Sequence, residues 1–463
     1  MDDWCIVMVL FNNLRKDSSE SEDRSHEQRK YVSNYSSEVN NQIDQTLQIV
    51  AKTIVKNIEG IKSIMIAGGF GKGEGSIKLT NAGKVILRRD FDIVCIVDHK
   101  PRSKTIDKLE DQIYKSLGIP NPTSSDFERG QSFVVDLMFL RKNDLIYPDI
   151  KFYDLKAASQ VLWGEDLRGV NPFTKKDVPI SSGLRLLFEK VTGLLGYFNV
   201  NYLESKKPTS EEKEYILSEC HKTFIEIGTA LCILGGKYEP KFSQRARGLN
   251  GFYRTKFPKI ARVLPDLPKK ILEYTNLRLN PESSYFDEDP IDLWFITKDY
   301  LKETLKLYAE IYAGKSISDW SNFPELVRAI APEYYKPFLG PLLRNRLHLE
   351  NTHVLHLIAF LYQGLTNLEY SYVTFSRRAG NPLKPLQSWH VSPSLKFFTA
   401  GALLLFSLGR DGSVEKILLR RAQEELDKCL YSDIDSFGDQ SWEKLQTRFL
   451  KARDLYRGYH FVK

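Results

Sequence analysis

Residues 65–76 read "MIAGGFGKGEGS". A short apolar run breaks here into five glycines, a lysine and a glutamate. Glycine loses more backbone freedom on folding than any other residue, so such a loop carries a cost that a bound ligand would offset. Backbone N–H groups at a helix start are a ready site for phosphate. The stretch therefore predicts a buried strand that ends in a phosphate-binding loop.

Helical and strand patterns alternate on both sides of this loop. Apolar residues three and four apart predict a helix from Asn41, and alternating residues around Asn81-Ala82-Gly83 predict a β-hairpin. We expect further core strands at 90–98 and 132–140, a helix at 105–118 between them, and a helix at 153–164 that ends at Gly164. This order is typical of an α/β unit with a mixed sheet flanked by helices.

The remainder of the chain has helical periodicity and proline-rich connections. The predicted helices are 183–198, 211–234, 291–314, 351–365, 392–409 and 414–430. We therefore expect an α/β domain followed by a large all-α region. The predicted segments are 1–40 (poorly ordered or a short extra segment), 41–170 (catalytic domain), 171–285 (helical domain against the active site) and 286–463 (C-terminal helical domain).

Composition limits the classes of function. The chain has 463 residues, with 42% hydrophobic and 27% charged residues, which is usual for a globular protein. A net charge of +7 argues mildly against long nucleic acid as a partner. Five scattered cysteines favour a reducing compartment, so we expect a cytoplasmic protein. The apolar run Trp4–Phe11 is too short for a membrane span, and no membrane partner is expected.

Three aspartates lie on the predicted strands. Asp90 and Asp92 are two residues apart, so their side chains point the same way while Phe91 points into the core. Asp136 lies on a neighbouring strand. Clustered carboxylates repel one another unless a cation lies between them, and Mg²⁺ prefers such oxygen ligands together with substrate phosphates. Glycine loop and carboxylates together predict metal-assisted chemistry on a nucleoside triphosphate.

These residues resemble a known superfamily, the DNA polymerase β-type nucleotidyltransferases. "GGFGKGEGS" followed by "DFD" and a later strand aspartate is similar to its glycine loop, D-x-D strand and third acid. The loop wording is close to the G-G-Y-G-R-G-E of bacterial uridylyltransferases that modify a nitrogen-signalling regulator. The resemblance covers residues 45–170, and the 21 positions from Gly69 to Asp90 exceed the usual spacing, which the predicted hairpin absorbs.

The resemblance implies roles for individual residues. Asp90 and Asp92 would hold two Mg²⁺ ions, with Mn²⁺ as an alternative. Asp136 would hold the catalytic ion and accept the proton of the attacking hydroxyl. Gly68 and Gly69 would approach the triphosphate of the NTP substrate, and Lys72 or Ser76 would contact its outer phosphates. The helical domain would add candidates from "GKYEPKFSQRARG" and the helix before it, namely Lys222, Tyr238, Ser243 and Arg245.

The expected activity is transfer of a nucleoside monophosphate from an NTP to a hydroxyl, with release of pyrophosphate. The acceptor is open; a protein side chain or a small molecule is favoured over an RNA end. Two other classes stay open. One is a non-catalytic nucleotide-binding or scaffold protein on the same fold, and the other is a helical interaction protein that keeps the N-terminal unit as a remnant.

Overall fold

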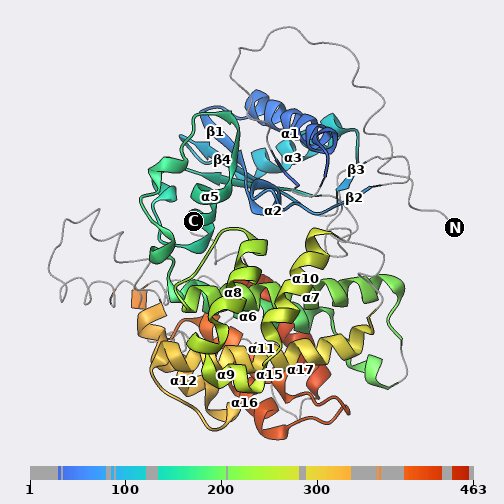
Figure 1. The fold of residues 1–463 in the computed structure, drawn as a ribbon, viewed down its shortest axis with the longest axis vertical. Helices are drawn as coiled ribbons and strands as arrows, with labels where there is room; N and C mark the ends of the chain where they lie inside the picture. Colours follow the sequence, from blue (N-terminus) through green and yellow to red (C-terminus); the bar gives the residue numbers. More distant parts are fainter. Residues whose placement is uncertain are drawn as a thin grey trace. The chain divides into compact units, whose positions relative to one another are not determined.

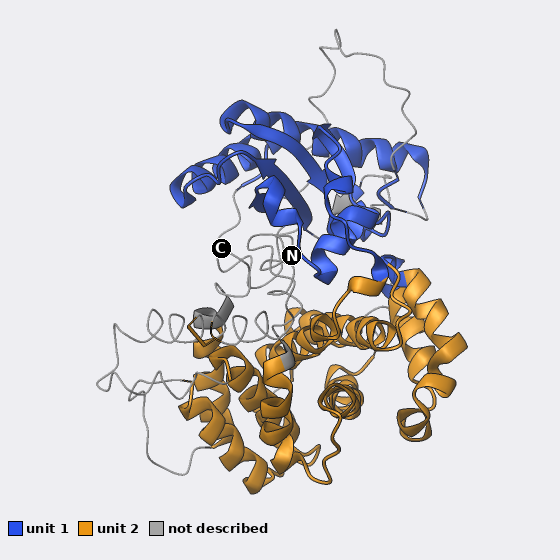
Figure 2. Cartoon of the chain, turned by 90° about the vertical axis from the view of Figure 1, so that its left-hand side faces the viewer, with its two compact units in different colours: residues 1–175, 240–242, 276–283 blue, residues 176–239, 243–275, 284–463 orange. Residues whose placement is uncertain are grey.

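A computed structural model gives the architecture of the chain (Figure 1). It describes residues 30–32, 35–79, 85–87, 90–120, 134–204, 207–280, 288–334, 361, 364–365, 391–429 and 441–457. The chain forms two compact units (Figure 2). Unit 1 comprises 1–175, 240–242 and 276–283, and unit 2 comprises 176–239, 243–275 and 284–463.

A mixed four-stranded sheet forms the centre of unit 1. Its strands are β1 (Ile61–Ile66), β4 (Phe91–Val97), β5 (Val135–Leu140) and β6 (Gln160–Gly164), in the order β5-β4-β1-β6. β4 and β5 are parallel, while β1 pairs antiparallel with both β4 and β6. The hairpin of β2 (Ile77–Leu79) and β3 (Val85–Leu87) is a separate antiparallel pair, as the sequence predicts.

Helices cover both faces of this sheet. α1 (Ser37–Asn57) begins at the N-cap Ser36, whose side chain accepts from the Val39 N–H, and α3 spans Ser103–Leu117. Both pack on one face over a continuous core that includes Phe91, Ile93 and Cys95. The short α2 (Gly68–Gly71) follows β1, and α5 (Ile150–Ala158) packs on the opposite face against Val94 and Ile96. The predicted mixed sheet with flanking helices is thus confirmed.

One predicted element is wrong. The helix expected at 153–164 ends at Ala158, and residues 160–164 form β6 at the edge of the sheet. The Ser159 backbone is extended, and Gln160-Val161-Leu162-Trp163 fits the spacing of a strand as well as that of a helix. Pairing with β1 decides the outcome. Gly164, the expected helix stop, has a φ of +82° at the end of the strand, where a Cβ would collide with the Lys62 carbonyl.

Unit 2 is largely helical in the residues that the structure describes. Its helices are α6 (Ile180–Tyr197), α7 (Ser210–Leu234), α8 (Phe242–Lys256), α9 (Pro258–Val263), α10 (Leu267–Leu279), α11 (Pro290–Ala313), α12 (Phe323–Tyr334), α15 (Pro393–Ser407), α16 (Lys416–Asp427) and α17 (Trp442–Arg457). The first residue of α8 and the end of α10 belong to unit 1. The largely helical remainder is confirmed, whereas most of the helix predicted at 351–365 lies outside the described residues.

The N-terminal segment expected at 1–40 is described only from residue 30. Tyr31 and Val32 are fully buried in the core of unit 1, and the Asn40 side chain accepts from the N–H groups of both. Residues 1–29 lie outside the description, and the division into four segments stays a prediction. Within the described ranges, no helix combines the length and apolar character needed to cross a bilayer.

Candidate functional site

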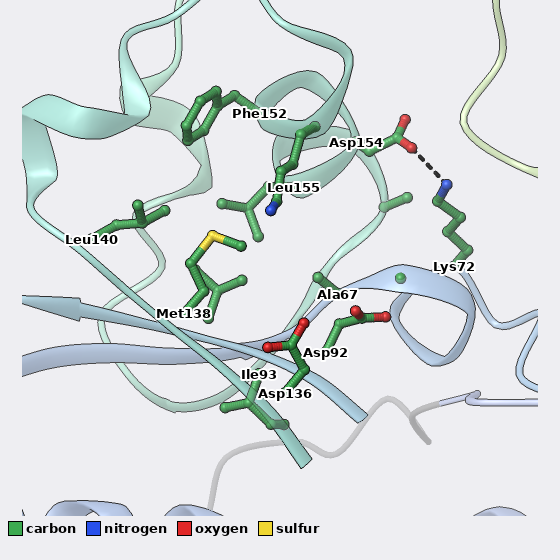
Figure 3. A pocket seen from close by; sticks show the side chains of 14 residues that line it. Ala67, Lys72, Asp92, Ile93, Asp136, Met138, Leu140, Phe152, Asp154 and Leu155 are labelled. Carbon is green, nitrogen blue, oxygen red and sulfur yellow. Dashed lines mark hydrogen bonds and ion pairs between the residues drawn. The ribbon is translucent and has the colours of Figure 1, made fainter. Parts of the chain in front are cut away.

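Asp92 and Asp136 lie side by side on parallel strands. In the β4–β5 register Asp92 pairs with Asp136, so both side chains leave the same face of the sheet. Phe91, on the opposite face, is fully buried in the core, as its alternation with Asp92 predicts. Both aspartates line one cavity (Figure 3). The structure therefore brings together two of the three predicted carboxylates.

The glycine loop begins directly above Asp92. Gly68 has a φ of +58°, and a Cβ at this position would collide with the Asp92 carboxylate. The Ala67 N–H donates to the Asp92 carbonyl at 2.8 Å, which ties the end of β1 to the start of β4. Only a glycine allows the backbone to approach this carboxylate so closely. The first N–H groups of α2 lack helical acceptors, as at every helix start.

The cavity has a volume of about 190 Å³ and is built by unit 1. The β-strands and the loop form its acidic side, and α5 forms the other. Besides the two aspartates, its lining residues are Ala67, Gly68, Lys72, Ile93, Val94, Met138, Leu140, Lys151, Phe152, Asp154, Leu155 and Ala158. It is an apolar recess with two carboxylates at one end and charged residues of α5 and the loop beside them.

Electrostatics in the cavity oppose the ionisation of both aspartates. The pKa of Asp92 is raised to about 6, chiefly by burial and then by the negative charges of Asp136 and Asp90, while Lys151 and Lys72 lower it. Desolvation also raises the pKa of Asp136, although its side chain keeps contact with solvent, and Lys151 opposes this rise. Repelling carboxylates of this kind are stabilised by a nearby cation.

Lys72 lies at the rim of the cavity in a buried ion pair. Its Nζ is 2.5 Å from Asp154 Oδ2, and the two side chains are only 8% and 18% exposed (Figure 3). The ammonium also lies 4.6 Å from the centroid of the Phe242 ring, from a segment that belongs to unit 1. The position predicted to contact phosphate is thus held by an acidic partner that sequence reasoning missed.

Buried polar side chains brace the loop from behind. The Glu74 carboxylate accepts from the Phe242 N–H at 2.6 Å, in keeping with a bracing role rather than a chemical one. The Gln160 amide donates to the carbonyls of Phe70 and Gly71 at 3.3 and 3.1 Å, and to that of Lys30 at 3.0 Å. β6 therefore holds the loop in place through Gln160.

Three of the predicted residues of unit 1 lie apart from the cavity lining. Asp90 precedes β4 and is exposed. Its negative charge raises the pKa of Asp92 and of Asp136, but it does not line the cavity. Gly69 sits in α2, where a Cβ would lie 3.2 Å from the Glu74 carbonyl, and Ser76 is buried beyond the loop. In the described part of the chain, no three His, Cys, Asp or Glu side chains form a metal cluster.

Two carboxylates nonetheless fit one divalent cation. Asp92 and Asp136 are oxygen ligands on one face, and Mg²⁺ takes one or two carboxylates and fills its other positions with water and phosphate. The pKa values of both aspartates are raised, so a bound positive ion would stabilise their ionised forms. A second ion would require Asp90, so the two-ion arrangement remains a prediction.

The four candidates from the helical region belong to unit 2. Arg245 is buried, and its Nη1 donates to the Tyr238 hydroxyl and the Glu239 carbonyl, both at 3.0 Å. Lys222 lies 3.8 Å from Glu219, and Ser243 is in the first turn of α8. Within unit 2, Arg245 and Tyr238 thus form a buried structural pair, and their triphosphate role stays untested.

Sequence reasoning missed Lys151, Asp154 and Gln160. The sequence "DIKFYDLK" carried the signal, because Lys151 and Asp154 are three residues apart and share one face of a helix. That face could not be assigned to the cavity without knowing how α5 packs on the sheet.

Comparisons with known proteins found no match to the chain among protein family models, curated proteins or solved structures.

Proposed function

We propose that unit 1 is a Mg²⁺-dependent nucleotidyltransferase that transfers a nucleoside monophosphate from an NTP to a hydroxyl. The supporting observation is the in-register pair Asp92 and Asp136, set in one cavity against a glycine backbone that no side chain could replace. The resemblance of loop and "DFD" to polymerase β-type nucleotidyltransferases supports the same activity.

In this proposal some residues bind the metal ion and the nucleotide, and one accepts a proton. Asp92 and Asp136 would hold Mg²⁺, which when bound neutralises phosphate charge and polarises the α-phosphate. Gly68 leaves room for the triphosphate beside Asp92, and Lys151 supplies positive charge from α5. The acceptor oxygen bonds to the α-phosphorus, the bond to the β-phosphate bridging oxygen breaks, and pyrophosphate leaves. The Asp136 carboxylate accepts the hydroxyl proton.

The test is pyrophosphate release by the full chain from each α-labelled NTP, with cellular RNA and protein extract as acceptor sources. Asp92→Asn should lower Mg²⁺-dependent release by about a hundredfold or more, because it removes charge at the reacting phosphate. Asp98→Asn is the matched control, since Asp98 follows β4 at its other end and is 51% exposed.

Equal release by Asp92→Asn and wild type would contradict the proposal. A non-catalytic nucleotide-binding protein would instead show an NTP-dependent rise in melting temperature with no pyrophosphate and no labelled product.

A further inference from the structure

The positive charge of the chain is concentrated in one segment. Residues 236–280 contain eleven lysines and arginines against three acidic residues, a net charge of +8, whereas the whole chain carries +7. The rest of the molecule is therefore nearly neutral. This segment comprises α8, α9 and α10.

The concentration is sharpest in α8 and α9. Residues 242–263 contain six basic residues and no acidic residue. Arg245 is buried, but the other five are exposed: Arg247, Arg254, Lys256, Lys259 and Arg262. Exposed cations without interspersed carboxylates produce a strong local positive potential, which attracts a polyanion.

The exposed face of α8 is otherwise polar and open. Gly248 and Gly251 lie one turn apart, and a Cβ at either would meet nothing within 4 Å. Gln244, Asn250 and Thr255 are exposed beside them. A backbone or a ribose could therefore approach this helix closely between Arg247 and Arg254.

This chemistry favours a nucleic acid over a membrane. Helices that lie on membranes set bulky apolar residues beside their cations, whereas α8 exposes amides, a hydroxyl and glycines, and Val263 is the single large apolar side chain that α9 exposes. Arginines with amide and hydroxyl side chains are the groups that contact phosphates and sugars. The ribose 2′-hydroxyl offers those amides an additional partner that DNA lacks.

We infer that the exposed face of α8 and α9 binds RNA through its phosphate backbone and riboses. RNA binding by this face does not depend on the proposed function. That RNA is also the acceptor of the nucleotide rests on the proposed function. The net charge of +7 argues mildly against long nucleic acid, but the +8 of residues 236–280 is a local concentration that the total for the chain does not reveal.

The test is fluorescence anisotropy of a labelled 20-nucleotide RNA with the full chain and no NTP. If the face contacts five phosphates, raising the salt concentration from 50 to 200 mM should weaken RNA binding about a hundredfold. The double variant Arg247→Glu/Arg254→Glu should lose affinity by about tenfold or more. Lys52→Glu/Lys56→Glu, with the same charge change at two exposed positions of α1, should bind as wild type does.

Equal loss in both double variants would overturn the surface assignment. Equal affinity for DNA of the same sequence would overturn the choice of RNA. Binding to vesicles with anionic headgroups and none to RNA would assign the face to a membrane instead.

Failure here is distinguishable from failure of the proposed function. Asp92→Asn should bind RNA normally while transferring no label to it, and Arg247→Glu/Arg254→Glu should keep its NTP-dependent thermal shift. RNA that binds to the wild type but receives no label would overturn the acceptor role.

Discussion

At the scale of single residues, the site depends on one glycine and one carboxylate that share a space. Gly68 turns the chain with a positive φ directly over Asp92, and the Asp92 charge is opposed by burial and by Asp136. A glycine with a positive φ and a buried carboxylate are both unfavourable for the stability of the folded chain by themselves. Both are explained if a cation and a phosphate complete the site.

Gly68→Ala should be markedly more destabilising than Gly118→Ala. Both glycines have similar positive φ values, +58° and +69°, so the backbone strain of about 1 kcal/mol is common to both. Gly118 has open space for a Cβ, whereas Gly68 faces Asp92, and overpacking adds about 1–3 kcal/mol. Denaturant unfolding measures the difference, and equal losses would contradict the close approach.

Asp92→Asn should stabilise the metal-free protein at pH 8. The folded-state pKa of Asp92 is raised to about 6, above its value in the unfolded chain. Protonated Asp92 therefore contributes stability to the folded protein at low pH, and this contribution is lost as the pH rises through 6. Asn does not ionise, so the free energy of unfolding of the variant relative to that of the wild type should rise by on the order of 2 kcal/mol between pH 4 and pH 8.

Urea unfolding at both pH values gives this difference. Saturating Mg²⁺ should reduce it at pH 8, because the ion stabilises only the chain that binds it. Asp98→Asn, at the other end of β4, is the control, and a gain of the same size there would refute the assignment to Asp92.

At the scale of elements, sequence periodicity predicted most of unit 1 but misassigned its edge. The hairpin followed from the alternation of its residues, whereas the strand with Asp92 is a short, mostly apolar run in which every residue except Asp92 is buried. Residues 160–164 suit a helix or a strand equally, and only pairing with β1 separates the two. The same limit concealed Lys151 and Asp154, because a helical face is visible in sequence but its neighbour is not.

The misassigned strand carries a testable contact. In Gln160→Glu a carboxylate would replace the amide that donates to three carbonyls, which should cost about 1–3 kcal/mol and loosen the loop. Hydrogen exchange at residues 70–75 should accelerate. Gln45→Glu, at an exposed position on α1, is the control and should change neither quantity.

At the scale of the whole molecule, the chain returns to unit 1 twice after leaving it. Segments 240–242 and 276–283 belong to unit 1 although helices of unit 2 lie between them in sequence. Phe242 supplies the N–H that Glu74 accepts and the ring beside Lys72. Sequence periodicity placed a boundary near residue 170 but could not reveal these returns, which are tertiary contacts.

A fragment of residues 1–175 should therefore be less stable than the full chain's first unit. It leaves the Glu74 carboxylate, 4% exposed in the whole protein, without its backbone donor, at a cost of about 1–3 kcal/mol. A fragment of residues 1–283 should recover this stability, because it contains both returning segments. Unfolding followed by near-ultraviolet circular dichroism compares them, and equal midpoints would show that the returning segments contribute nothing.

These returns also set an order of events on the ribosome. Domains generally fold as units during synthesis, starting from the N-terminus. Here β6, the last strand of unit 1, is made long before Phe242, so the loop gains its contacts to Phe242 only after residue 242 has emerged. Translation of residues 176–239 thus separates the assembly of the Asp92–Asp136 pair from the arrival of Phe242, which holds the loop.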